Sequence, residues 1–412
     1  MIKDSLKTNY YASEIILILL FSLNLFANGQ NSLKGVLLDK DNHAPVADAT
    51  VYINGTTKGT STDLNGSFTL NDVSFPCQLM VSRVGYDLKM IDIDNFYVDK
   101  LTLYLKEKTV HLSEVKVTGK NTRSHAVEKF REAFIGTDDW GKKAKLLNDS
   151  VLVFNTITDT IDIQANTLGS NNQCAGEAKF NGIDSINRLL ITSTFSVKSK
   201  APLMIDLPAL GYKLYVDLVR FYIFDYRNSS VCKYLGYYYF KPYDFVNDRT
   251  DRRYRKNRMN AYYNSRDHFC RTVYHNELKR NGYLISGKFL NDSTNQWEQK
   301  FINLSDFMTC KDDDQIQIIG KKGETFYLYS FYNYDYKPID LTNSKKFNFN
   351  SFTEFWQDNY TYLKAKSSIT FLSDTCTIRS DGTIPNNDIM FGGEISKKKA
   401  GAMVPWSYKI GD

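Results

Sequence analysis

The sequence predicts a mainly β protein, α+β overall, in which a small N-terminal β-sandwich precedes a larger β-rich domain with a few helices. Aromatic residues make up 14% of the 412 residues while Pro numbers only 8, and aromatic side chains suit the pleated, half-buried surface of a sheet. Short apolar alternations also recur at regular spacing between turn residues over the first hundred residues. A chain of this length has room for two or three domains.

The N-terminal segment has the features of a secretory signal peptide over residues 1–29. Lys3 and Lys7 precede an apolar run at residues 15–26, and small residues at cleavage spacing precede Gln30. The run is too short to cross a bilayer comfortably, and a short membrane anchor is the competing interpretation. We therefore expect an exported chain in the periplasm or associated with the outer membrane.

Charge and cysteine content exclude some partners. The formal net charge of +6, from 52 basic and 46 acidic residues, is too small to indicate nucleic-acid binding. The 6 cysteines are scattered, without a C-x-x-C pair or the spacing of a zinc site, so we expect no cofactor. Disulfides and isolated buried thiols both remain open.

Residues 30–108 predict the β-sandwich, with about seven short strands. Turn chemistry separates the alternating segments, as in DNHAP, NGTTKG and TDLNG. The segments that we expect to form strands are LKGVLLD, ATVYING, GSFTL, QLMVSRV and LTLYL.

The segment GTSTDLNGSFTL within this domain is either a calcium loop or a hairpin turn. On the calcium template, Ser61, Asp63 and Asn65 take positions one, three and five, Gly66 takes six, and Asp72 takes twelve. Ser61 is a weak ligand, Asp72 is short where a bidentate Glu is needed, and the flanks alternate as strands instead of helices. We therefore expect a structural hairpin, in which Asp63 caps the turn and Asn65 and Gly66 are residues that tolerate the left-handed conformation.

These residues resemble the carboxypeptidase regulatory-like domain, a transthyretin-like sandwich. The resemblance rests on KGVLLDKDNHAPVADATVYINGTTKGTSTDLNGSFTL, continuing to VSRVGYD and LTLYLKE. It implies a fold more than an activity, because the module is an accessory in the families that carry it.

Residues 109–123 predict a linker. Within it, LSEVKVTGK is similar to the connector that follows this domain in TonB-dependent receptors, although too few residues follow to build such a transporter. The similarity leaves open a role as an accessory component of a TonB-linked uptake system in the outer membrane.

Residues 124–412 predict the larger β-rich domain. SHAVEKFREAFI places apolar residues at helical spacing near residues 124–135, and strand-like segments follow. Residues 251–280 lack Gly and Pro and predict one long helix. Its many Arg and Lys residues would suit phosphate or anionic lipid, but we favour a solvated basic face.

The predicted helix contains a motif that includes Asn257, Arg258, Ser265, His268 and Arg271, whose role is unknown. Together with PALGYKLYVDL, YLGYYYF and the chain's ending, this motif resembles bacterial envelope proteins that are named only for their carboxypeptidase regulatory-like domain. The resemblance covers nearly the whole mature chain and implies no activity.

Two groups of residues are candidates for a catalytic site. A zinc peptidase would use the H-x-x-E pair His125 and Glu128 with a distant His268 or His275, but this short pattern arises easily by chance. Ser265 and His268 would suit a nucleophile beside a base, yet no oxyanion hole or orienting acid is specified. A polar helix face that hydrogen-bonds the neighbouring sheet explains these residues more simply.

We therefore expect an exported, non-catalytic envelope protein that binds a protein or glycan, with a metal-dependent, carboxypeptidase-like hydrolase and the TonB-linked accessory as alternatives. The expectation rests on export, on the lack of a convincing catalytic set, and on the Tyr-rich segments YLGYYYFKPYDF and FYLYSFYNYDY. Those aromatic residues are either exposed binding residues or core residues.

Overall fold

A computed structural model describes most of the chain, and strands predominate in it. The chain separates into unit 1, residues 1–53 and 58–107, and unit 2, residues 54–57 and 108–412. The expected signal peptide and nearly all of the expected linker lie outside the described residues. The structure describes residues 32–94, 100–108, 122–157, 161–162, 190–226, 230–291, 293–312, 314–333, 337–342, 355, 363–385 and 388–410.

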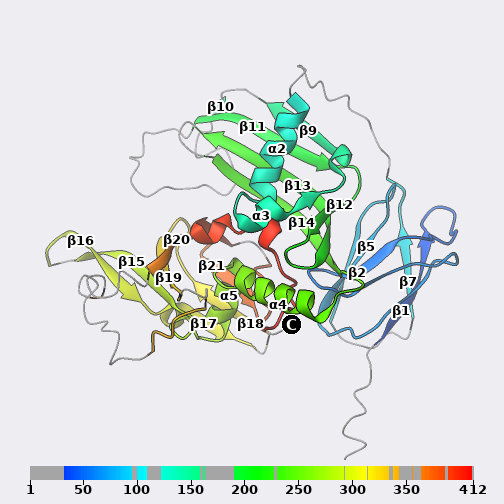
Figure 1. The fold of residues 1–412 in the computed structure, drawn as a ribbon. Coiled ribbons are helices and arrows are strands. Elements are labelled where there is room, and N and C mark those ends of the chain that lie inside the picture. The colour runs from blue at the N-terminus through cyan, green and yellow to red at the C-terminus, as the bar shows by residue number, and fades with distance from the viewer. Residues whose placement is uncertain are drawn as a thin grey trace, which may run out of the picture. The chain divides into compact units, whose positions relative to one another are not determined.

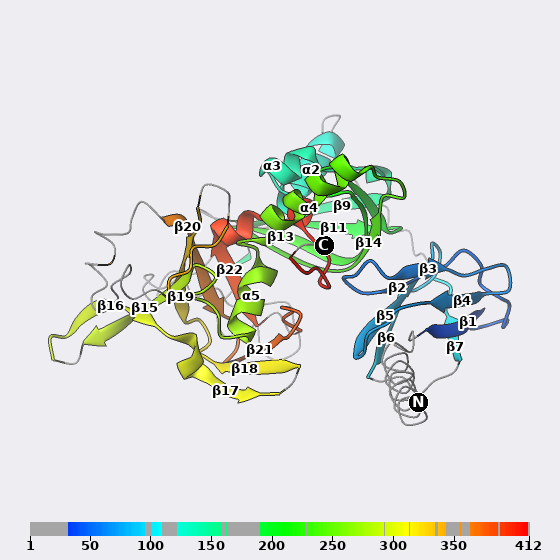
Figure 2. The same cartoon turned by 60° about the horizontal axis from the view of Figure 1, so that its bottom comes forward.

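Unit 1 is the predicted β-sandwich of seven strands (Figure 2). One sheet has the order β4-β1-β7 and the other β3-β2-β5-β6, with β1 and β7 parallel. Alternate residues of each strand point inward, and Leu37, Val51 and Leu79 are fully buried between the sheets. The strands are β1 (Leu33–Asp39), β2 (Thr50–Ile53), β3 (Gly59–Ser61), β4 (Ser67–Leu70), β5 (Cys77–Ser82), β6 (Lys89–Ile93) and β7 (Leu101–Leu105).

The first part of unit 2 is a seven-stranded sheet with helices on one face (Figure 1). Its central path is β10-β11-β13-β12-β8, while β14 pairs with β13 and β9 with β11. The helices are α2 (Thr122–Phe134) and α3 (Asp139–Lys143), and η1 (Asp149–Val151) is a 3-10 turn. The strands are β8 (Lys145–Leu146), β9 (Leu152–Ile157), β10 (Ile161–Asp162), β11 (Leu190–Ser199), β12 (Leu203–Leu207), β13 (Tyr212–Tyr226) and β14 (Ser230–Pro242).

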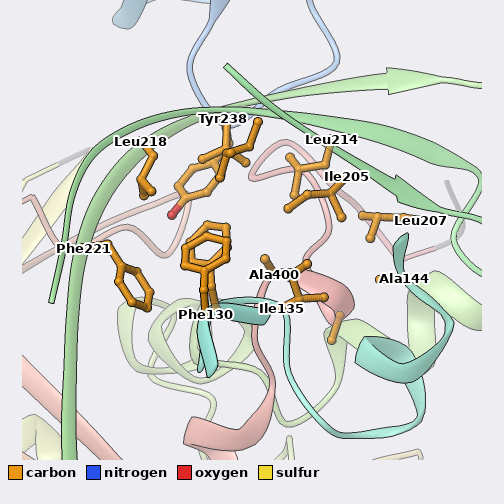
Figure 3. Close-up of a cluster of buried hydrophobic side chains, with 14 of the residues drawn as sticks. Phe130, Ile135, Ala144, Ile205, Leu207, Leu214, Leu218, Phe221, Tyr238 and Ala400 are labelled. Carbon is orange, nitrogen blue, oxygen red and sulfur yellow. The ribbon is translucent and has the colours of Figure 1, made fainter. Parts of the chain in front are cut away.

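The core of this part lies between α2 and the sheet. Phe130 of α2 points toward the sheet, and its ring centroid is 4.8 Å from that of Phe221 on β13 (Figure 3). Along β13 the buried residues are even-numbered up to Leu218, and then Phe221 and Ile223 are buried. A bulge between Leu218 and Arg220 inserts the extra residue that changes this alternation.

The second part of unit 2 contains two helices and two further sheets. The helices are α4 (Asp248–Tyr262) and α5 (Arg266–Tyr274). One sheet has the order β16-β15-β19-β20-β22 and the other β17-β18-β21. The strands are β15 (Tyr283–Asn291), β16 (Gln296–Ile302), β17 (Met308–Lys311), β18 (Gln315–Ile319), β19 (Thr325–Phe331), β20 (Leu363–Phe371), β21 (Thr375–Arg379) and β22 (Ile389–Gly393). Short 3-10 turns are η2 (Leu304–Phe307), η4 (Glu394–Lys397) and η5 (Ala400–Ala402).

The prediction of one helix across residues 251–280 is wrong. Tyr263 leaves the helical conformation, Asn264 has a φ of 57°, and the Ser265 hydroxyl accepts the His268 amide at 3.1 Å as the N-cap of α5. Asn tolerates the left-handed region and Ser caps helices, so these residues interrupt a helix without Gly or Pro. No helix among the described residues is long and apolar enough to cross a membrane.

Candidate functional site

The turn in GTSTDLNGSFTL is built on Asp63. Its carboxylate accepts the Asn65 amide at 2.9 Å and the Ser67 amide at 2.8 Å, and Gly66 has a φ of 70°. Asp63 therefore caps the turn as expected. The expected chain reversal is present, because the Gly66 amide donates to the Asp63 carbonyl and the Asp63 amide donates to the Ser67 carbonyl, both at 2.9 Å. The flanking strands do not pair with each other, however, since β3 pairs with β2 and β4 pairs with β1. The turn instead carries the chain from one sheet of the sandwich to the other.

The residues considered for calcium have other partners. Asp63 uses its carboxylate on backbone amides, and Asp72 forms an ion pair with Lys58 at 3.3 Å. Across the described residues, no three His, Cys, Asp or Glu side chains gather as a metal site would need. This turn has a structural role.

The residues considered for zinc lie in different environments. His125 and Glu128 are exposed on α2, and Glu128 faces Arg131 at 3.6 Å. His268 is only 2% exposed, whereas His275 is exposed at the end of α5. The described part of the chain brings no three such ligands together.

Four described cysteines, Cys77, Cys232, Cys270 and Cys376, are free thiols. Burial raises the pKa of Cys77 and of Cys232 to about 11 and that of Cys376 to about 12. These three thiols stay protonated at neutral pH, which disfavours them as nucleophiles.

The motif residues of α4 hold the helix against the turn that joins β12 and β13. The Asn257 side chain donates to the Ala209 carbonyl at 2.8 Å, and Arg258 Nε donates to the Leu210 carbonyl at 2.9 Å. The Arg258 guanidinium also lies 4.3 Å from the ring centroid of Tyr212. Both side chains thus satisfy backbone carbonyls of a distant segment, which is a structural role.

His268 is buried among aromatic rings. Its Nδ1 atom is 2.8 Å from the Tyr283 hydroxyl of β15, and the rings of Tyr262 and Tyr263 pack against it edge-on. Nε2 is buried, and none of the described residues forms a hydrogen bond with it. Burial lowers the pKa of His268 to about 3, and the Asn281 side chain only partly opposes this shift. The imidazole is therefore uncharged at neutral pH and faces Tyr283 on β15. This agrees with the expectation that a polar helix face hydrogen-bonds the neighbouring sheet.

Ser265 is not paired with His268 as a nucleophile with its base. Its hydroxyl accepts the backbone amide of His268, while the imidazole turns to Tyr283. The hydrogen bond between nucleophile and base that a Ser-His pair requires is replaced by helix capping.

Arg271 joins α5 to the C-terminal segment. Its Nε donates to the Asp381 carbonyl at 2.9 Å, Nη1 donates to the Tyr408 carbonyl at 2.6 Å, and Nη2 donates to the Trp406 carbonyl. The guanidinium lies 5.3 Å from the Tyr262 ring centroid. The planar fork of Arg suits this arrangement better than a Lys would.

Lys398, which the sequence did not single out, complements Arg271. Its ammonium donates to the carbonyls of Asn260 and Ala261 at 3.0 and 2.9 Å and to that of Tyr263. These carbonyls end α4, where a cation also offsets the helix dipole. Burial lowers the pKa of Lys398 to about 8, so its ammonium is still mostly protonated at neutral pH and can donate to these carbonyls.

The motif residues therefore fix the fold, and the candidate binding surface lies on the sheet face opposite α2. We define the outer aromatic face as Met204, Tyr215, Tyr222, Phe224 and Tyr239. Met204 is directly opposite Tyr215, which is directly opposite Tyr239 across the strands. The rings of Tyr215 and Tyr239 stack at 5.8 Å, and those of Tyr222 and Phe224 stack at 5.9 Å.

Apolar and charged residues complete this face. Val219 and Leu235 are 41% and 36% exposed, although residues of their type are usually buried. Arg220 is directly opposite Leu235, and Lys233 is directly opposite Tyr222. The Tyr-rich segment of β14 contains both core residues and outward-facing residues, the two alternatives that the sequence left open. Tyr238 and Phe240 are core residues, while Tyr239 faces outward.

The family match to known proteins lies in the N-terminal part of the chain. Residues 33–117 match the CarboxypepD_reg-like domain, and no curated protein matches the chain. A mutant type II cohesin-X-dockerin complex from Acetivibrio cellulolyticus is 21% identical and aligns with a TM-score of 0.18, covering 26% of this chain and 75% of that chain.

A putative membrane-associated protein of unknown function from Bacteroides fragilis is similar over a longer region. It is 11% identical with a TM-score of 0.16, covering 52% of this chain and 99% of that chain. The family match and the seven-stranded sandwich agree with the resemblance found in the sequence, and the protein carries a carboxypeptidase regulatory-like domain at its N-terminus.

Proposed function

We propose that the protein is an exported, non-catalytic envelope protein that binds a protein partner through the outer aromatic face. The observation that carries this proposal is the pair of ring stacks on β13 and β14, Tyr215 with Tyr239 and Tyr222 with Phe224. A glycan is the alternative ligand.

The composition of this face favours a protein partner. Tyr, Met and Arg are enriched in the cores of protein interfaces, and binding energy concentrates in a few such residues. Met204, Arg220 and the tyrosines provide this combination on adjacent strands. Strands also hold side chains more rigidly than loops, so less conformational entropy is lost on binding.

The proposed location follows from the N-terminal sequence. The apolar run at residues 15–26 follows two lysines and precedes small residues, as in a secretory signal peptide. We place the mature chain in the periplasm or at the outer membrane.

Site-specific photo-crosslinking in the native host tests the proposal. A photoreactive phenylalanine analogue replaces Tyr215 in one variant and Tyr222 in another. Tyr104, a 38% exposed tyrosine on β7 of unit 1, provides the matched control position. We expect the same protein adduct from both test positions and no such adduct from position 104.

Three other results are informative. If glycosidase treatment lowers the mass of the adduct, the ligand of this face is a glycan and the proposal of a protein partner is wrong. The same adduct from position 104, or none from either test position, would contradict binding through this face.

A further inference from the structure

The exposed side of α4 carries a stripe of cations. We define the basic stripe as Arg249, Arg252, Arg253 and Lys256, which occupy positions i, i+3, i+4 and i+7. At 3.6 residues per turn these positions share one face of the helix. All four residues are exposed, so the stripe presents four positive charges over about 10 Å.

The opposite side of α4 fixes the orientation of the stripe. Tyr254, Ala261 and Tyr262 are buried. Asn257 and Arg258 donate to the carbonyls of Ala209 and Leu210. The helix therefore cannot rotate the stripe toward the core without breaking these contacts.

The two carboxylates of α4, Asp248 and Asp251, lie in its first turn, and neither forms an ion pair with a residue of the stripe. Asp251 pairs with Arg255 at 2.8 Å, outside the stripe. Arg249, Arg252 and Lys256 form no ion pair with any described residue. Arg253 lies 5.6 Å from the Tyr254 ring centroid, a contact that leaves its charge uncompensated.

An exposed aromatic residue stands beside the N-terminal end of the stripe. Phe245 is 98% exposed, two residues before the N-cap Asn247. The Asn247 side chain accepts the Thr250 amide at 2.9 Å, which fixes where the helix begins. Phe245 is four residues from Arg249, so the two Cα atoms lie within about 14 Å.

We propose that the basic stripe and Phe245 dock on a bilayer surface that carries anionic phospholipid headgroups. Cations near such a surface are attracted to lipid phosphates, and an exposed aromatic ring partitions into the interface. A protein surface would be expected to place its aromatic residues among the cations, whereas here a single ring stands at one end. This inference is independent of the outer aromatic face, which lies on different elements.

Vesicle co-sedimentation tests the inference with the chain from Gln30 onward, the proposed mature form, so that the apolar run at residues 15–26 cannot anchor the protein in the bilayer. The readout is the ratio of binding to vesicles of phosphatidylglycerol and phosphatidylcholine over binding to vesicles of phosphatidylcholine alone.

The test variant replaces all four stripe residues with Gln, which keeps helix propensity. The matched control changes the net charge equally on unit 1 through four exposed lysines. These substitutions are Lys34→Gln, Lys40→Gln, Lys100→Gln and Lys106→Gln.

We expect the ratio of the stripe variant to be at least about tenfold lower than that of the wild type, because each basic residue near an anionic surface raises the affinity about fivefold. We expect the control to lose less than about twofold, and added salt to weaken wild-type binding. A ratio near one for the wild type, or equal losses in both variants, would overturn the inference.

Phe245→Ala distinguishes a bilayer from a soluble anion. It should lower binding to anionic vesicles severalfold while leaving binding to soluble inorganic polyphosphate unchanged. If Phe245→Ala leaves vesicle binding unchanged while the stripe variant loses polyphosphate binding, the surface recognises soluble phosphate and the bilayer assignment is wrong.

Discussion

Replacing Arg271 with Lys tests whether the motif residues are structural. Arg271 donates to the carbonyls of Asp381, Trp406 and Tyr408 and lies over the Tyr262 ring. The Lys ammonium keeps the charge but cannot reach carbonyls in three directions with a planar fork.

The expected loss follows from these contacts. A hydrogen bond from a charged donor is worth about 1.5–3 kcal/mol, and Lys would keep about one of the three. Rehydration of half-buried carbonyls reduces the loss of the other two. We therefore expect Arg271→Lys to lower the free energy of unfolding by about 2–4 kcal/mol.

Urea unfolding followed by tryptophan fluorescence measures this loss. Trp406 is well placed as a reporter, because its own carbonyl accepts a hydrogen bond from Arg271. Circular dichroism should be recorded alongside, since two units need not unfold in one step. Arg280→Lys is the matched control, because Arg280 is exposed and pairs with Glu277 at 3.2 Å, a pairing worth at most about 1 kcal/mol. Equal stability of the two variants would refute the structural role of Arg271.

Two further stability predictions concern His268 and Gly66. Burial lowers the pKa of His268 from 6.5 to about 3, so between these values the unfolded chain binds the proton that the folded chain excludes. Acidification from pH 7 to pH 4 should therefore lower the free energy of unfolding by up to about 3 kcal/mol through this residue, and urea titrations should show a shallower pH dependence in His268→Gln. Gly66→Val should lower the melting temperature of unit 1, because the residue has a φ of 70° and a Cβ would lie 2.3 Å from the Leu37 carbonyl oxygen. We expect a loss above about 1 kcal/mol, and an unchanged melting temperature in calorimetry would refute this.

The sequence predicts structure well where the residues that determine it are neighbours along the chain. Alternating apolar residues gave the strands of unit 1, and the turn residues around Asp63 gave the turn. The pairing of β3 and β4 with different neighbours was missed, because sheet assignment depends on residues far along the chain. The helix break at Asn264 was missed because it needs neither Gly nor Pro.

The candidate site was predicted in composition but not in arrangement. The Tyr-rich segments were visible, but the inward or outward direction on β13 depends on the bulge near Leu218, which only the pairing with β14 defines. The role of Arg271 was not predictable, because its carbonyl partners lie 110 to 137 residues further along the chain.

The most direct measurement of the central claim is the affinity of the crosslinked partner for the purified chain by titration calorimetry. Tyr215→Ala with Tyr239→Ala removes one ring stack from the outer aromatic face, and Tyr104→Ala is the control. Loss of central interface aromatics typically costs about 2 kcal/mol or more, so we predict at least about thirtyfold weaker binding for the double variant. We predict unchanged binding for the control. Equal affinity of the wild type and the double variant would contradict a binding function of this face.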